Sequence, residues 1–231
     1  MKRAGALLMF CLSGGGALAV PAVALPGLGP DSHRSVVDVN VAPWRILGRV
    51  QTSLGGRCTG FAVAPTVMVT AAHCLWLPAT HHYIQPGDIH VLMGYAVGQY
   101  RLHAQVTQFV IAPGYDPANE GGTAPEDRAT LILDRQVVTP GDLVPYGVAR
   151  LGDQAMLVGY PQDRSEVPYG DIACQINGLA VNGLIHHDCS ATRGDSGGPL
   201  FVRQSDGEWA VVGIDVLATS GRGGFAAPLP R

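Results

Sequence analysis

The segment that decides the fold is Thr192–Leu200, with the sequence TRGDSGGPL. Ser196 stands between glycines on a predicted tight turn, and the missing side chains let a carbonyl group approach its hydroxyl. The glycines also permit backbone angles that direct the amide N–H groups of Gly194 and Ser196 at one point, where they would hold an oxyanion. Because a serine hydroxyl is a weak nucleophile by itself, this segment predicts a general base and an orienting acid elsewhere in the chain.

Two further segments supply candidates for the base and the acid. His73 lies in VTAAHC, residues 69–74, at the end of an apolar run. Asp127 stands just ahead of the apolar stretch Ala129–Leu133, and Asp116 and Asp134 are the nearby alternatives. Asp134 follows the stretch, where a turn acid is expected, and Asp116 lies in a turn rich in Pro and Gly. We therefore prefer Asp127 as the orienting acid.

The three segments occur in the order His, Asp, Ser, spaced 54 and 69 residues apart, and together they resemble the chymotrypsin/trypsin superfamily of serine proteases. The order differs from that of subtilisins and α/β-hydrolases. The segments DSHR at 31–34 and GYP at 159–161 resemble the bacterial, glutamyl-endopeptidase-like branch of the superfamily. The resemblance covers about residues 31–229, although only the motif segments are specific.

The resemblance implies an all-β fold of two antiparallel six-stranded β-barrels, with the active site in the cleft between them. A content of 31 Gly and 17 Pro with only 14% charged residues agrees with many turns and few helices. Apolar runs between turn residues predict strands at 44–51, 59–64, 67–70, 89–93, 100–111 and 129–133, then at 155–160, 172–179, 183–187, 199–202, 209–217 and 223–227.

We divide the chain into a signal peptide at 1–24, an N-terminal and candidate pro-segment at 25–42, a first barrel at 43–140 with His73 and Asp127, and a second barrel at 141–231 with Ser196. The first segment has a basic start, an apolar centre and the sequence AVA at 22–24, as signal peptides do. A membrane anchor is the weaker alternative because glycines break the apolar stretch. We expect a secreted or periplasmic protein.

Four cysteines follow the predicted signal peptide: Cys58, Cys74, Cys174 and Cys189. An exported chain favours two disulfides, for which the sequence permits three pairings. The local pairs Cys58–Cys74 and Cys174–Cys189 enclose loops of similar length, and a bridged His-Cys turn also matches the family. No C-x-x-C spacing occurs and the cluster HHDC at 186–189 stands alone, so we predict no metal site. The proposed chemistry needs no cofactor.

By resemblance, Ser190 lies at the floor of the pocket for the substrate residue that precedes the cleaved bond, and Asp215, Val216, Leu217 and Ala218 form its wall. Asp215 stands where glutamyl endopeptidases have a histidine, and an acid there would repel a glutamate side chain. Asp215 either attracts Arg or Lys of the substrate or is a solvated or paired strand acid. The histidines without a partner pattern are expected on the surface or in loops: His81, His82, His90, His103, His186 and His187.

These observations predict a secreted serine endopeptidase with a Ser196, His73 and Asp127 triad. The alternative is a catalytically weak or inactive homologue that acts as a protein-binding module. The resemblance also implies a structural role for Asp195, whose family counterpart pairs with a buried amino terminus. A net charge of −3 without a basic run disfavours nucleic acid and anionic membranes as partners. We expect a polypeptide substrate, no stable membrane association and a monomer.

Overall fold

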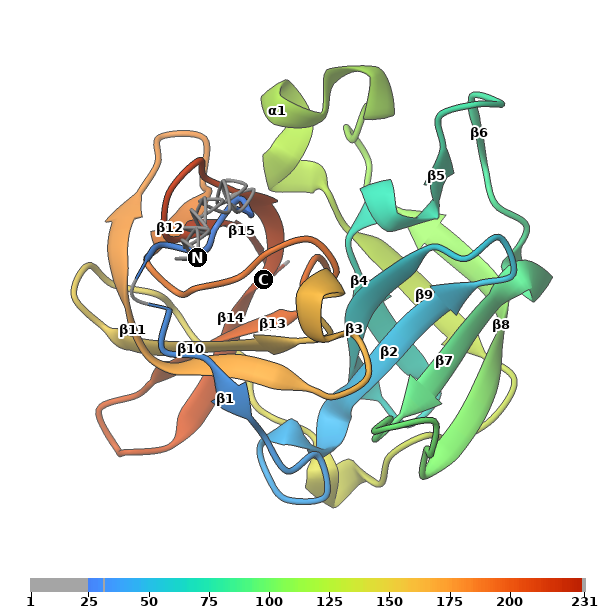
Figure 1. Cartoon of the computed structure of the whole chain (residues 1–231), viewed down its shortest axis with the longest axis horizontal. Helices are drawn as coiled ribbons and strands as arrows, with labels where there is room; N and C mark the ends of the chain where they lie inside the picture. The colour runs from blue at the N-terminus through green and yellow to red at the C-terminus, as the bar shows by residue number, and fades with distance from the viewer. Residues whose placement is uncertain (1–24, 31, 230–231) are drawn as a thin grey trace, which may run out of the picture.

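The structure is a computed structural model of the chain, and it describes residues 25–30 and 32–229. Its strands form two closed six-stranded antiparallel barrels that lie side by side (Figure 1). The predicted all-β architecture is therefore confirmed. The predicted signal peptide, residues 1–24, lies outside the described residues.

The first barrel closes in the strand order β2-β3-β4-β9-β8-β7. Its strands are β2 (Leu47–Thr52), β3 (Arg57–Ala64), β4 (Val67–Thr70), β7 (Ile89–Met93), β8 (Leu102–Ile111) and β9 (Ala129–Leu133). In β7 the side chains of Ile89, Val91 and Met93 are buried, whereas His90 and Leu92 between them are partly exposed. Since successive side chains of a strand point to opposite faces, this alternation places one face of β7 in the barrel interior.

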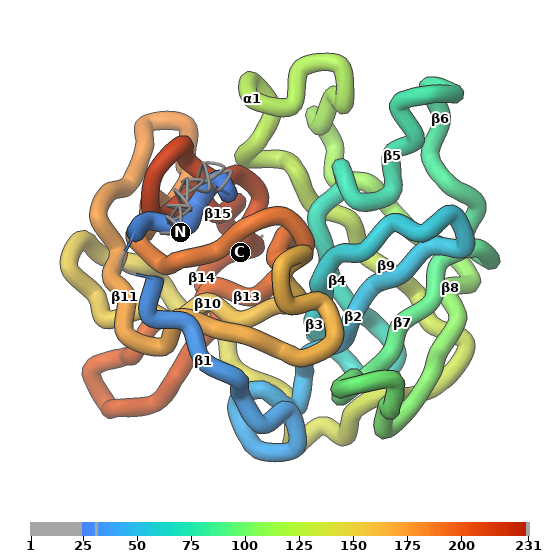
Figure 2. Tube along the Cα trace, in the orientation of Figure 1, coloured from blue at the N-terminus to red at the C-terminus, as the bar shows by residue number. Residues whose placement is uncertain are grey.

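The second barrel has the order β11-β10-β13-β14-β15-β12 and closes through pairing of β11 with β12. Its strands are β10 (Gln154–Gly159), β11 (Tyr169–Leu179), β12 (Ile185–His187), β13 (Pro199–Arg203), β14 (Trp209–Ala218) and β15 (Gly224–Pro228). Leu157, Ile176 and Val202 pack in its core. The short strand β1 (Ser35–Val36) adds to the outside of β11. Figure 2 shows this N-terminal part of the chain running along the second barrel.

Short elements lie outside the barrels. They are the hairpin of β5 (Trp76–Leu77) and β6 (His82–Tyr83), the single helical turn α1 (Glu120–Thr123), and 3₁₀ helices at Trp44–Ile46, Ala72–Leu75, Pro86–Asp88, Pro117–Asn119, Ala124–Glu126, Pro140–Asp142 and Gln162–Arg164.

One of these elements differs from the predicted boundaries. Residues 44–46 were expected to begin the first strand, but the Trp44 amide donates to the Val41 carbonyl at 3.0 Å and forms a turn. Residues 119–125 lie between the predicted strands at 100–111 and 129–133, and α1 lies within them.

Two disulfides join the local cysteine pairs. Cys58 is bonded to Cys74, with Cα atoms 6.2 Å apart, and Cys174 to Cys189, with Cα atoms 4.8 Å apart. Two disulfides were expected, and of the three pairings that the sequence permits the structure has the two local ones. The first bond ties β3 to the turn that carries His73, and the second ties β11 to the segment that precedes Ser190. Within the described residues, the helices are all too short and too polar to span a bilayer.

Candidate active site

His73 and Asp127 lie on turns that leave the same end of two paired strands. β4 pairs with β9, and the partners Thr70 and Ala129 stand at that end. His73 follows β4 on a 3₁₀ helix, and Asp127 ends the 3₁₀ helix just ahead of β9. The His73 Nδ1 atom lies 2.6 Å from Asp127 Oδ2, and the His73 backbone amide donates to Asp127 Oδ1 at 2.9 Å. One carboxylate therefore holds both the imidazole ring and the turn that carries it.

The same carboxylate sets the basicity of the imidazole. Asp127 is buried, with 2% of its surface exposed. Burial by itself lowers the pKa of His73, but the hydrogen bond from the ring to Asp127 and the negative charge of that carboxylate outweigh it. The pKa of His73 is consequently raised above its ordinary value of 6.5. The site thus favours a positive charge on the ring.

Ser196 lies on the turn that leads into β13, and both barrels hold this turn. The Ser196 carbonyl accepts a hydrogen bond from the Thr59 amide of β3 at 2.9 Å. The Gly197 amide donates to the Asp215 carbonyl of β14 at 2.8 Å. Gly197 has a φ of +84°, and a Cβ atom there would lie 2.1 Å from the Thr59 carbonyl oxygen. Only glycine therefore fits between the serine and the first barrel.

Thr59 connects the barrels through its side chain as well. Its Oγ1 donates to the Gly194 carbonyl at 2.8 Å and accepts from the Tyr160 amide at 2.9 Å. The Thr59 carbonyl in turn accepts from Thr70 Oγ1 at 2.7 Å. Thr59 has no exposed surface. The sequence carries no signal for this role, because a threonine in a strand is ordinary and the partners of Thr59 lie far away in the sequence.

The amides of Gly194 and Ser196 face away from the core of the loop. The Arg193 carbonyl accepts a hydrogen bond from the Gln162 amide at 2.6 Å, and the Asp195 carbonyl accepts one from Gly198 at 2.7 Å. In a planar trans peptide the N–H group points opposite to the carbonyl. The amides of Gly194 and Ser196, which belong to the same two peptide groups, therefore point away from the amides of Gln162 and Gly198. Gly194 adopts a φ of +96°, where glycine is favoured.

His73 and Ser196 line one cavity of about 230 Å³. The predicted wall residues Asp215, Val216, Leu217 and Ala218 line it too. The predicted floor residue Ser190 does not line this cavity. Ser190 is buried, and its amide donates to Asp171 Oδ2 at 2.9 Å. The structure therefore brings Ser196, His73 and the predicted wall residues together at one cavity.

Asp215 has a buried partner, His187, that the sequence-based prediction did not include. The His187 Nε2 atom lies 3.2 Å from Asp215 Oδ1, and His187 has no exposed surface. The expectation of a surface or loop position is wrong for His187 because it lies on β12, the strand that closes the second barrel. Asp215 was expected either to attract Arg or Lys of a substrate or to be a solvated or paired acid on a strand. The contact with His187 fits a paired acid on a strand. The alternation of Ile185 and His187 on one face of a strand is the sequence signal that could have found it.

Asp195, which directly precedes Ser196, is a buried acid with a structural role. Its Oδ2 accepts a hydrogen bond from the Thr192 amide at 2.8 Å, which closes the loop on itself. Burial raises the pKa of Asp195 well above its ordinary value. Among the described residues, no hydrogen-bond partner faces its second oxygen, Oδ1.

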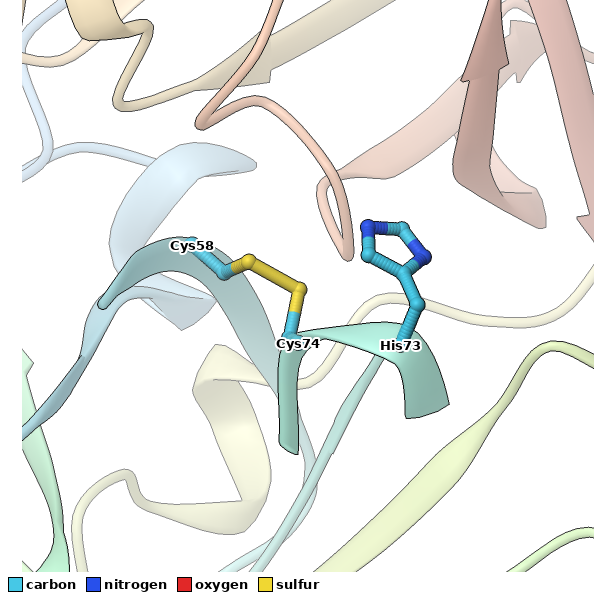
Figure 3. A group of neighbouring side chains, drawn as sticks. All are labelled: Cys58, His73 and Cys74. Atoms are coloured by element: carbon cyan, nitrogen blue, oxygen red, sulfur yellow. A yellow bond between two sulfur atoms is a disulfide. The ribbon is translucent and has the colours of Figure 1, made fainter. Parts of the chain in front are cut away.

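Cys58, Cys74 and His73 form the one group of neighbouring metal-ligand side chains within the described part of the chain. Figure 3 shows the disulfide and the His73 ring leaving the same short turn in different directions. Because both sulfur atoms belong to the disulfide, neither is a thiolate that could bind a metal ion. The group therefore supports the His73 turn and offers no metal site.

The sequence profile of the Trypsin family matches residues 34–230. The chain belongs to the Trypsin family. The Trypsin-family motifs that we recognised around His73, Asp127 and Ser196 thus stand in a chain that matches the family over most of its length.

Two known proteins show what this Trypsin-family chain is similar to. "Serine protease filzig" of Drosophila melanogaster is 25% identical over 214 residues, which cover 74% of this chain and 12% of that protein. The chain therefore spans only a small part of the length of that curated relative. A solved structure, "Structure of Glu endopeptidase in complex with MPD", matches with a TM-score of 0.72 and 20% identity over 87% of this chain and 94% of that chain. At this identity the likeness concerns the fold alone.

Proposed function

We propose that this Trypsin-family chain is a secreted serine endopeptidase that hydrolyses peptide bonds with Ser196, His73 and Asp127. One observation carries the proposal: His73 Nδ1 lies 2.6 Å from the buried Asp127 carboxylate, and His73 lines the same cavity as Ser196. A histidine that donates its Nδ1–H to a carboxylate keeps the lone pair of Nε2 free to take a proton from an alcohol.

In the proposed reaction, Ser196 Oγ attacks the carbonyl carbon of a peptide bond while His73 Nε2 takes the hydroxyl proton. A C–O bond forms, and the carbonyl oxygen becomes an oxyanion that accepts hydrogen bonds from the amides of Gly194 and Ser196. The C–N bond then breaks as His73 returns the proton to the leaving amine. Water repeats the sequence and releases the acyl group. Asp127 holds the imidazole tautomer and stabilises the imidazolium, in agreement with the raised pKa of His73.

The proposed pocket for the residue that precedes the cleaved bond comprises Asp215, Val216, Leu217 and Ala218. Ser190, predicted as the pocket floor, is buried and does not line the described cavity. Asp215 is the acid that lines the cavity, which supports a preference for Arg or Lys over Glu in the substrate. The buried contact with His187 already occupies one oxygen of that carboxylate, so we expect this preference to be modest.

Export and the division of the chain complete the proposal. Two disulfides agree with an oxidising compartment, and residues 1–24 have the composition of a signal peptide. We assign residues 43–140 to the first barrel unit and residues 141–231 to the second, with the proposed catalytic residues divided between them.

A fluorophosphonate label tests the proposal, because it reacts only with a serine activated by a neighbouring base. We expect mass spectrometry to find the label on Ser196 in the wild-type protein. His73→Ala should abolish labelling although Ser196 is still present, and Ser196→Ala serves as the control for labelling elsewhere. A folded wild-type protein, with both disulfides formed, that resists the label would contradict the proposal and support the inactive, protein-binding alternative. Cleavage of a peptide library then reports the side-chain preference, which strict selection of Glu would contradict.

A further inference from the structure

The first described residues of the chain reach the cavity that contains the proposed active site. Pro26 lines this cavity together with His73 and Ser196. The described chain begins beside β15, on the second barrel (Figure 1). From there it runs to β1, which pairs with β11 on the outside of the same barrel. We call residues 25–30 the pocket strap.

Backbone hydrogen bonds anchor the pocket strap to the loop between β14 and β15. The Gly27 amide donates to the Thr219 carbonyl at 2.8 Å, and the Gly27 carbonyl accepts from the Gly223 amide at 3.1 Å. Gly27 also forms an isolated parallel bridge with Arg222. These contacts use the main chain on both sides, so they fix the position of the strap regardless of most of its side chains.

Gly27 fits tightly between the two sides of the cavity. A Cβ atom on Gly27 would lie 1.7 Å from the Ala191 carbonyl oxygen and 3.1 Å from Ala218 Cβ. Ala191 directly precedes Thr192, and both Thr192 and Ala218 line the cavity. Gly27 also has a φ of +77°, which glycine adopts without strain. Glycine is therefore required where the strap passes between these two segments.

The pocket strap lines the cavity without filling it. A volume of about 230 Å³ stays open beside Pro26. The His73 side chain keeps 24% of its surface exposed, and Ser196 is only half-buried. The strap therefore has the position of a wall, and it leaves the proposed nucleophile and base within reach of a substrate.

We propose that the pocket strap is a fixed wall of the substrate pocket and that Pro26 is a specificity-determining residue. Its rigid ring narrows the space for the substrate side chain that precedes the cleaved bond, so that polypeptides with an aromatic residue there are poor substrates. This inference rests on the proposed function, because it assumes that the cavity beside Ser196 receives that side chain.

Two variants test the wall. Pro26→Ala removes ring atoms from the cavity and leaves the anchors of Gly27 in place. Because one methylene in such a pocket changes selectivity by about 10- to 200-fold, we expect the ratio of kcat/KM for Phe over Ala substrates to rise at least about tenfold. Gly27→Ala forces the strap away from Ala191 and should shift the ratio in the same direction. Gly121→Ala is the matched control, because a Cβ atom there meets nothing within 4 Å.

A binding measurement separates this inference from the proposed function. p-Aminobenzamidine, an aromatic amidine, occupies a pocket without reacting with serine, so its Kd can be measured in a Ser196→Ala background. We expect Pro26→Ala to tighten binding about tenfold and Gly121→Ala to leave the Kd unchanged. An unchanged Kd for Pro26→Ala, or no binding by any variant, would contradict the proposal that Pro26 is a wall of the substrate pocket. A second result would also contradict the proposal. If Gly27→Ala raised the rate of fluorophosphonate labelling more than about a hundredfold and left the ratio of kcat/KM for Phe over Ala substrates unchanged, the strap would block access to Ser196 instead of forming a wall of the pocket. If the wild-type protein is not labelled, the proposed function is wrong. The Kd of p-aminobenzamidine tests the role of Pro26 independently, because this ligand does not react with Ser196.

Discussion

Thr59 Oγ1 donates a hydrogen bond to the Gly194 carbonyl at 2.8 Å, across a sequence separation of 135 residues. The same hydroxyl accepts from the Tyr160 amide at 2.9 Å, and the Thr59 amide donates to the Ser196 carbonyl at 2.9 Å. A buried residue of the first barrel therefore holds the loop of the second barrel that presents the proposed nucleophile and oxyanion amides. The positions of His73 and Ser196 depend on each other through this contact.

Thr59→Val should lower kcat and leave KM nearly unchanged. Valine has the shape of threonine but leaves the Gly194 carbonyl and the Tyr160 amide without their buried partner. Such a loss costs about 1–3 kcal/mol, which corresponds to about a 5- to 150-fold fall in kcat if it misplaces the oxyanion amides. Thr59→Ser keeps the hydroxyl and is the control. Equal kcat values for the wild-type protein and the valine variant, from steady-state kinetics, would show that Thr59 does not position this loop.

Asp127→Asn should fold and lose about four orders of magnitude in kcat, because an amide stabilises the wrong imidazole tautomer and no imidazolium. Circular dichroism checks the fold, and peptide hydrolysis measures the rate. Asp116→Asn is the control: Asp116 Oδ1 accepts from the Ala118 amide at 2.9 Å, a cap that asparagine preserves. Near-normal activity of Asp127→Asn would assign the orienting role to another acid.

The pH dependence of kcat/KM should report the pKa of His73. The neutral ring is the proposed base, so activity should fall as the pH is lowered through a midpoint above 6.5, since the carboxylate of Asp127 raises this pKa. The raised pKa also adds to folding stability below pH 6.5, and this contribution is lost as the pH rises through the folded-state pKa. NMR titration of the imidazole in Ser196→Ala checks the assignment. A midpoint below 6.5 would contradict the stabilising effect of Asp127.

Asp195→Asn should reduce the loss of folding stability that occurs as the pH rises from 4 to 7. Burial raises the pKa of Asp195, so above its ordinary value of 3.8 the folded protein holds a proton that the unfolded chain releases. Stability contributed by the neutral carboxyl is therefore present below pH 3.8 and declines as the pH rises toward the folded-state pKa. Asparagine keeps the oxygen that accepts from Thr192. Urea unfolding at pH 4 and pH 7 should show a smaller decline in the variant, and an identical decline would contradict the raised pKa.

The sequence by itself determined the identities of the candidate site residues and the barrels that carry them. Strands at 67–70, 89–93 and 129–133 have the predicted bounds because each is a short apolar run that ends at turn residues. In the last two strands buried and partly exposed side chains also alternate, which selects one buried face. The glycines around Ser196 likewise predict a turn, because glycine adopts backbone angles that other residues rarely adopt.

Only the tertiary structure decided the contacts of Thr59, His187 and Pro26. Thr59 meets Gly194 between the barrels, His187 faces Asp215 inside the second barrel, and Pro26 reaches the cavity of Ser196 from the N-terminal segment. Each of these contacts joins strands or loops that come together when a barrel closes or when the two barrels pack. Local periodicity records which side of a strand is buried, but it carries no information about which distant segment lies against that side.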